Sequence, residues 1–161
     1  MNENLKKTGA GGNWKRMDEQ FDSSIVLQSS GLSCVSAVGE MLLKRRGIRL
    51  SQQEIIDIIG EPTHLGSLAE LLNQADILET GKEWHGVFVE EEILETLLNL
   101  ESLGVVLREP FEIGHAVLVE GKTKEGLVKI KDPFDQTSYK MLWEDFLNHW
   151  NGEVIFYGRI K

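Results

Sequence analysis

Residues Gln28–Arg46 read QSSGLSCVSAVGEMLLKRR and contain Cys34, the only cysteine of the chain. Ser33 can cap a helix that begins at Cys34, and good helix formers continue to Arg46. Gly47 then suits the left-handed position that often follows a helix end. A thiol at a helix N-terminus faces unpaired backbone N–H groups and the positive end of the helix dipole, and both favour the nucleophilic thiolate. The stretch therefore predicts a helix that presents a reactive cysteine at its first residue.

A hydrogen-bond donor lies close to this cysteine in the sequence, because Gln28 precedes Cys34 by six residues. A nucleophile that attacks a carbonyl needs a donor nearby to hold the oxyanion of the tetrahedral intermediate, and a glutamine side-chain amide is such a donor. The alternative is that Cys34 is a small buried residue of a core helix, a frequent environment for an unpaired cysteine. The residues downstream decide between the two interpretations.

The composition predicts one soluble globular domain. The chain has 161 residues, of which 27% are charged and 41% hydrophobic, and its formal net charge is −9. This charge repels phosphate backbones and anionic membranes, so we expect neither a nucleic-acid partner nor a membrane partner. Neither a long apolar run nor an apolar N-terminal segment is present. We therefore expect a soluble protein that is cytoplasmic, or that is secreted or delivered into a target cell.

Metal and cofactor sites are not expected. A single cysteine excludes an intrachain disulfide and a CxxC site. The four histidines lie at positions 64, 85, 115 and 149, without the spacing that is typical of metal ligands. We interpret His64, His85 and His149 as structural or solvated residues.

The first 22 residues differ from the rest of the chain. Residues 1–13 are polar and end in a glycine-rich run, which predicts a flexible leader or a linker from a larger protein. We expect Trp14–Phe21 to form a short helix. The sequence thus divides into a leader at 1–22 and one domain at 23–161.

Within that domain, helix signals come first and strand signals second. Ser51–Glu54 and Ser67–Glu70 both have the capping-box pattern and predict helix starts, and a third helix is expected at Glu90–Leu100. Alternating apolar residues then predict strands, with one short helix at Met141–Trp150. The predicted strands are Val105–Leu107, His115–Glu120, Leu127–Lys131 and Glu153–Ile160. Helices followed by an antiparallel sheet indicate an α+β domain.

Two of these strands are expected to form a hairpin that joins a histidine to a carboxylate. We predict that Gly121 pairs with Gly126 around a loop at residues 122–125. Apolar residues then match along one face, and a shift of one residue would break the match. The matched pairs are Val119 with Val128, Val117 with Ile130, and finally His115 with Asp132. Directly opposed side chains are close enough for the carboxylate to orient the imidazole.

These residues, in this order, resemble the papain-like cysteine peptidases, and more narrowly the bacteriocin-processing double-glycine peptidases. The resemblance extends from about Leu27 to Trp150 and rests on Gln28, Cys34, His115 and Asp132-Pro133. It also includes a basic helix end at Lys44–Gly47, the Gly66-Ser67-Leu68 start of a helix, GHAVLVEG at Gly114–Gly121 and KIKDPFDQTSYKMLWEDF at Lys129–Phe146. The last of these stretches is the most specific.

The resemblance implies a papain-like fold, in which an N-terminal helical lobe carries the nucleophile helix and packs on a C-terminal antiparallel sheet. It implies that Cys34 is the nucleophile, His115 the general base and acid, and Asp132 the residue that orients His115. Gln28 becomes the oxyanion donor. The residues expected to contact substrate are Ser30, Gly31, Ser33, Gly66 and Gly114. The family usually has Asp-Cys-Gly around the nucleophile, and this chain departs from that pattern with Ser33-Cys34-Val35, so the shape of the subsite stays open.

The function implied is that of a cysteine endopeptidase that cuts proteins or peptides after small residues, in particular Gly-Gly. A domain of this kind with a glycine-rich leader and without its usual transporter is similar to a secreted toxin of interbacterial competition. Such a toxin needs a cognate immunity protein that covers the active site. Two alternatives remain, namely a deamidase or transglutaminase-like acyl transferase that uses the same residues, and a catalytically silent module that only binds peptides. A maturation peptidase is the alternative to the toxin role.

Overall fold

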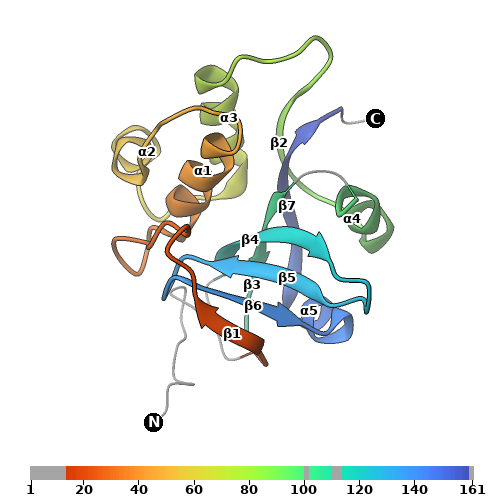
Figure 1. Ribbon diagram of the computed structural model, residues 1–161. Coiled ribbons are helices and arrows are strands. Elements are labelled where there is room, and N and C mark those ends of the chain that lie inside the picture. Colours follow the sequence, from red (N-terminus) through yellow and green to blue (C-terminus); the bar gives the residue numbers. More distant parts are fainter. Residues whose placement is uncertain (1–13, 100–101, 110–113, 160–161) are drawn as a thin grey trace.

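The computed structural model describes residues 14–99, 102–109 and 114–159 of the chain, which form a twisted sheet flanked by helices (Figure 1). The helices are α1 Cys34–Lys44, α2 Gln52–Ile59, α3 Leu65–Ala75, α4 Glu91–Leu97 and α5 Trp143–His149. The strands are β1 Met17–Phe21, β2 Glu83–Phe88, β3 Leu103–Leu107, β4 His115–Lys122, β5 Val128–Asp132, β6 Thr137–Met141 and β7 Trp150–Gly158. They pair antiparallel in the order β1-β6-β5-β4-β3-β7-β2.

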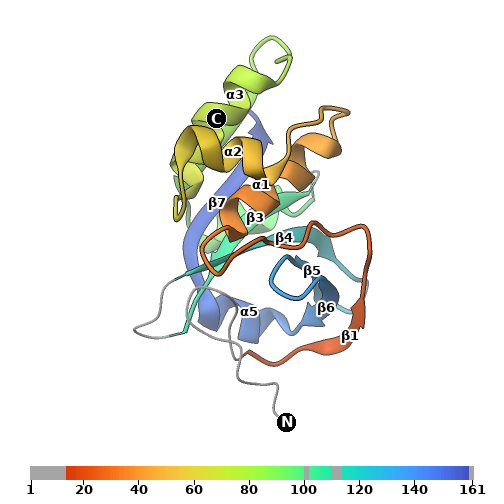
Figure 2. The ribbon, with the colours of Figure 1, turned by 90° about the vertical axis from the view of Figure 1, so that its left-hand side faces the viewer.

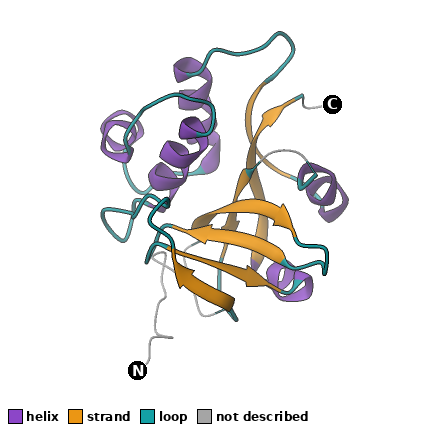
Figure 3. Cartoon of the chain, in the orientation of Figure 1, coloured by secondary structure: helices purple, strands orange, loops and turns teal. Residues whose placement is uncertain are grey.

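Helices α1, α2 and α3 gather into one lobe above the strands β4, β5 and β6, as two perpendicular views show (Figures 1 and 2). Successive side chains of β4 point to opposite faces of the sheet, so this strand contributes to two hydrophobic cores. Ala116 and Leu118 belong to the core under α1 and α3, whereas Val117 and Val119 belong to a second core that includes Phe146 of α5. The predicted α+β arrangement of a helical lobe on an antiparallel sheet is confirmed (Figure 3).

Helix α1 is held tightly between the sheet and α3. Val38 and Leu42 point into the core, and both are almost fully buried. Gly39 faces α3, where an added Cβ would lie 2.6 Å from Leu68 Cδ1. The absence of a side chain at this position lets α3 approach α1 closely. The packing fixes the position of the first residue of α1, which is Cys34.

The N-terminal segment is a strand, so the predicted helix at Trp14–Phe21 is wrong. Strand β1 pairs with β6 at the edge of the sheet, with Met17 opposite Lys140 and Phe21 opposite Thr137. Without β1, the outer edge of β6 would have unpaired backbone N–H and C=O groups. The hydrogen bonds that β1 makes with β6 therefore outweigh the local helix propensity of this segment. Residues 1–13 of the predicted leader lie outside the described residues.

Two further strands, β2 and β6, were not predicted from the sequence. His85, which was interpreted as structural or solvated, lies in β2. In β6 only Tyr139 and Met141 are buried, so the strand carries too short an apolar alternation to be recognised. The predicted ends at Leu100 and Ile160 fall outside the described residues.

The two predicted capping boxes have different outcomes. At α2 both reciprocal hydrogen bonds between Ser51 and Glu54 are present, as predicted. At α3 the prediction is wrong, because the helix begins at Leu65 and its cap is His64, whose Nδ1 accepts the Ser67 N–H at 3.3 Å.

Among the described residues, none of the helices has the length and apolar character needed to cross a membrane.

Candidate active site

Cys34 is the first residue of α1, as predicted, and its thiol lies against β4. The backbone N–H of Ala116 donates a hydrogen bond to Cys34 Sγ at 3.3 Å, and the residue is 6% exposed. Burial by itself raises the pKa of the Cys34 thiol. The hydrogen bond and positive charge of His115, together with the Ala116 N–H, outweigh burial and lower that pKa below its ordinary value. The site thus favours the thiolate.

The loop before α1 is organised differently from the prediction. Ser33 occupies the N-cap position, but its side chain makes no capping hydrogen bond to the helix. Instead the Ser33 hydroxyl accepts the Ser30 N–H at 3.0 Å and lies 3.2 Å from the Ser30 carbonyl, to which it donates. Ser33 therefore closes the loop on itself, and the helix dipole acts on Cys34 without a side-chain cap.

His115 and Asp132 form a buried hydrogen-bonded pair, with 2.6 Å between His115 Nε2 and Asp132 Oδ1. The predicted hairpin register is nevertheless wrong by two residues, because Val119 pairs with Ile130. A bulge near Gly121, whose φ is +100°, lengthens β4 before the turn. A shift of two residues keeps every side chain on its face, so His115 reaches Asp132 diagonally instead of straight across.

The charges of this pair stabilise each other in the protein interior. Burial lowers the pKa of His115, but the negative charge of Asp132 and its hydrogen bond outweigh burial and raise that pKa to about 10. Burial likewise raises the pKa of Asp132, yet the charge of His115 holds it well below the usual range of a carboxyl group. The pair is therefore imidazolium and carboxylate at neutral pH. Because Asp132 occupies Nε2, the Nδ1 nitrogen is the one that can exchange a proton with Cys34.

Asp132 has further partners that sequence analysis did not identify. Its Oδ1 accepts the Phe134 N–H at 2.9 Å, and its Oδ2 accepts the Tyr139 hydroxyl at 2.7 Å. Arg16 Nη2 lies 3.5 Å from the same Oδ2. Trp14 donates its indole N–H to the Tyr139 hydroxyl at 2.9 Å. Two of these residues precede β1, so the N-terminal segment belongs to the surroundings of the site.

Gln28 lies beside the turn that follows Asp132, because its backbone N–H donates to the Pro133 carbonyl at 2.8 Å. Its side-chain Nε2 donates to the Ser30 carbonyl at 2.8 Å, and the residue is 8% exposed. An amide nitrogen carries two hydrogens, so one remains available for an oxyanion. The role of Gln28 as oxyanion donor stays a prediction.

Replacing Gln28 with alanine tests that role. We expect a folded protein with a kcat reduced on the order of 10²–10³, which is the usual cost of losing one oxyanion donor. Steady-state kinetics on a cleavable peptide would measure the loss, with thermal melting as the control for folding. An unchanged kcat would place Gln28 outside the reaction.

A cavity of about 160 Å³ opens beside Cys34. Of the five residues predicted to contact substrate, Gly31 and Gly114 line it, together with Val106 and Leu32. The others have different surroundings. Ser33 is 1% exposed, the Ser30 hydroxyl donates to Glu61 at 2.9 Å, and Gly66 packs against the backbone of Gly86.

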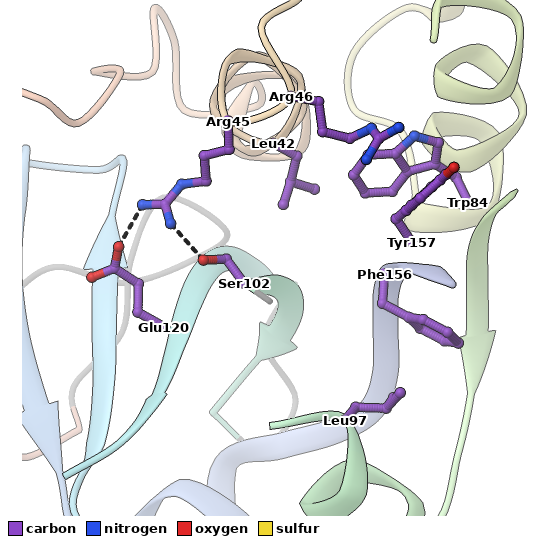
Figure 4. Close-up of a pocket in the computed structure, with 9 residues that line it drawn as sticks. All are labelled: Leu42, Arg45, Arg46, Trp84, Leu97, Ser102, Glu120, Phe156 and Tyr157. Carbon is purple, nitrogen blue, oxygen red and sulfur yellow. Dashed lines mark hydrogen bonds and ion pairs between the residues drawn. The ribbon is translucent and has the colours of Figure 1, made fainter. Parts of the chain in front are cut away.

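A larger cavity, of about 400 Å³, lies at the opposite end of α1 (Figure 4). Its two arginines are already engaged. Arg45 binds Glu120 and Ser102, and Arg46 binds Asp76 and stacks on the ring of Tyr157 with its Cζ 3.8 Å from the centroid. Its lining contains neither a cysteine nor a histidine, so the smaller cavity is the candidate reactive site. In the part of the chain that the structure describes, no cluster of His, Cys, Asp and Glu side chains is placed to hold a metal ion.

Comparisons with known proteins agree with this geometry. Residues 22–159 match the model of the peptidase C39 family. Cysteine protease effector 1 of Escherichia coli O1:K1:H7 is 38% identical over 150 residues, which are 92% of this chain and 29% of that protein. This chain therefore spans less than a third of the length of that relative.

Solved structures show the same fold. The peptidase domain of Streptococcus ComA, a bi-functional ABC transporter involved in quorum sensing, superposes with a TM-score of 0.68 at 20% identity, over 83% of this chain and 96% of that one. The Streptococcus mutans ComA peptidase domain in complex with a small-molecule inhibitor gives 0.56 at 21% identity, over 83% and 97%. The papain-like α+β fold is thereby confirmed. Since the family match extends over most of its length, this chain belongs to the peptidase C39 family and is a cysteine peptidase.

Proposed function

We propose that this domain is an endopeptidase that cuts after two small residues, in particular Gly-Gly, with Cys34, His115 and Asp132 as its catalytic triad. One observation carries the proposal, namely that the three side chains form a continuous buried line. The line extends from the 2.6 Å hydrogen bond between Asp132 and His115 to a thiol whose pKa His115 lowers. Cys34 also lines the cavity, so the thiol is placed to meet a substrate there.

The chemistry follows from these positions. The Cys34 thiolate attacks the carbonyl carbon of the scissile peptide bond, and the remaining Gln28 amide hydrogen and a backbone N–H bind the oxyanion. His115, protonated at Nδ1, gives its proton to the leaving amine. Water then hydrolyses the thioester, with His115 acting as the base. Asp132 keeps the imidazole ring in the orientation that both steps require.

The walls of the cavity support the proposed preference for small residues. An added Cβ at Gly114 would lie 2.4 Å from Val106 Cγ1, so the Val106 side chain already fills the space beside Gly114 in the wall of the cavity. Leu32 and Val35 make the same region apolar. A substrate without β-carbons next to the cut can bring its backbone into such a narrow space, and glycine bends into it freely.

A peptide library would test this preference. We expect cleavage after Gly-Gly and Gly-Ala at rates at least about tenfold above those after bulky residues, since a few unfavourable kilocalories separate a fitting side chain from a clashing one. Mass spectrometry of the products would locate each cut, and the Cys34→Ala protein is the control for contaminating peptidases. Equal cleavage after leucine or phenylalanine would contradict the proposal.

We further propose that the domain acts as an antibacterial effector, whose producer makes an immunity protein that covers Cys34. The name of the Escherichia coli relative, a cysteine protease effector, supports this role. The partners of the domain would then be a protein substrate inside the target cell and the immunity protein inside the producer.

A further inference from the structure

We propose that residues Trp14–Phe21, here called the N-terminal strap, hold the His115–Asp132 pair in its reactive geometry, with Arg16 and Trp14 as positioning residues. The inference rests on the proposed peptidase function and deepens it. The strap precedes residue 22, where the match to the peptidase C39 family begins. The support that it gives therefore comes from outside the part of the chain that matches the family.

Arg16 supports the carboxylate directly. Its Nη2 lies 3.5 Å from Asp132 Oδ2, on the side of the carboxylate that faces away from His115. The side chain is 7% exposed, and its Cζ lies 4.4 Å above the centroid of the Tyr139 ring. Glu19 accepts a hydrogen bond from Arg16 Nη1 at 2.8 Å and steadies the guanidinium from behind. A buried carboxylate needs this compensation, because an unpaired charge in the interior is costly.

Trp14 supports the same carboxylate through Tyr139. The indole N–H can only donate, so the Tyr139 oxygen must accept it, and the tyrosine proton is then directed to Asp132. The indole ring also stacks near the imidazole of His115, with 6.2 Å between centroids and 26° between planes. Trp14 is 5% exposed. It thus orients both members of the pair from one position.

Strand pairing explains why the strap can do this. The pairing of Met17 with Lys140 and of Phe21 with Thr137 fixes the strap along β6. Tyr139 lies in the same stretch of β6 and points into the core. The residues just before Met17 therefore lie next to Tyr139 and Asp132. Displacing the strap would remove two of the groups that contact Asp132 or the tyrosine bound to it.

Arg16 also influences Cys34 through the charge of Asp132. The negative charge of Asp132 raises the pKa of Cys34, and a cation beside that carboxylate weakens its field. The groups that face Asp132 are His115 from β4, Tyr139 from β6 and Arg16 from the strap, and Arg16 in turn faces Glu19 and Asp135. His64 and Glu153 line the cavity beside Cys34. Without Arg16 we expect a higher pKa of Cys34.

The test compares Arg16→Met with Lys15→Met, which removes a neighbouring, exposed charge of the same sign. We expect Arg16→Met to lower kcat about 10- to 100-fold with little change in KM, because misplaced catalytic groups slow the chemistry and not the binding. The pH midpoint of Cys34 alkylation by iodoacetamide should rise. Arg16→Lys should recover part of both effects, and Lys15→Met should match the wild type.

Alkylation needs no substrate, so it separates this inference from the proposed function. A wild type that cleaves nothing would contradict the peptidase proposal, while the alkylation midpoints would still decide the role of Arg16. If Arg16→Met does not fold, Trp14→Phe is the substitute, because it keeps an aromatic ring near His115 and loses the N–H that binds Tyr139. We expect this variant to show a smaller fall in kcat and a smaller rise in the alkylation midpoint. A wild-type midpoint in every folded strap variant, or activity that falls only with the folded fraction, would overturn the inference.

Discussion

Replacing Cys34 with alanine is expected to abolish both proteolysis and toxicity. Among the described residues that line the cavity, only Cys34 has a thiol, and the pKa of that thiol is lowered. Losing the nucleophile of a hydrolase lowers kcat on the order of 10⁶-fold. Expression of the wild type in a bacterial cytoplasm should stop growth, and expression of Cys34→Ala at the same level should not. Quantifying new protein N-termini in the two cultures would link growth arrest to cleavage.

The substitution is also a clean control for folding. It removes one sulfur atom, together with the hydrogen bond from the Ala116 N–H and the interaction with His115. A loss of stability near 1 kcal/mol is expected, which is typical of a point mutation and too small to unfold a domain. New N-termini with wild-type protein identify a peptidase, whereas deamidated side chains without cleavage would identify the acyl-transferase alternative. A wild type that cleaves and is harmless would contradict the effector role and favour a maturation peptidase.

The sequence predicts the chemistry of the site better than the path of the chain around it. Cys34 begins a helix because good helix formers follow it, and this local pattern is enough to predict where the helix starts. His115 and Asp132 are brought together by a hairpin whose apolar faces restrict the register to steps of two. The turn, with Lys122 opposite Val128, and the one-residue bulge near Gly121 together set a register two residues away from the predicted one, and only the folded sheet shows that.

The strap is where sequence reasoning fails, and the reason is physical. Trp14 and Arg16 follow a polar, glycine-rich run, and no periodicity links them to a site more than a hundred residues away. Their positions depend on β6, in which only Tyr139 and Met141 are buried and whose apolar alternation is too short to be recognised in the sequence. Long-range strand pairing decides such segments, and local propensity has little weight in them.

Replacing His115 with alanine is expected to lower kcat/KM on the order of 10³–10⁴, because both the general base and the charge that lowers the pKa of Cys34 are lost. The effect on the thiol can be measured without substrate. An ordinary thiol with a pKa of about 8.5 is only about 0.3% thiolate at pH 6. Burial raises the pKa of Cys34 further once His115 is gone. Alkylation by iodoacetamide at pH 6 should therefore slow by about 300-fold or more where the wild-type thiol is fully ionised.

The pH dependence of stability gives an independent check, and its sign follows from the direction of the pKa shift. The pKa of His115 is raised to about 10, so the folded state holds a proton that the unfolded chain releases near 6.5. This stabilisation is complete below about pH 6.5 and disappears as pH rises through about 10. The lowered pKa of Cys34 contributes with the opposite sign, because the folded thiolate lacks a proton that the unfolded thiol keeps up to about pH 8.5. Denaturant melts should therefore be made in a Cys34→Ala background, where the decline should appear and where a further His115→Ala, or His115→Gln if alanine does not fold, should remove it. Asp132→Asn should retain more activity than His115→Ala, since Tyr139 and the Phe134 N–H still hold the side chain at that position.

Equal alkylation rates in wild type and His115→Ala would exclude the thiolate–imidazolium pair and, with it, the assignment of His115.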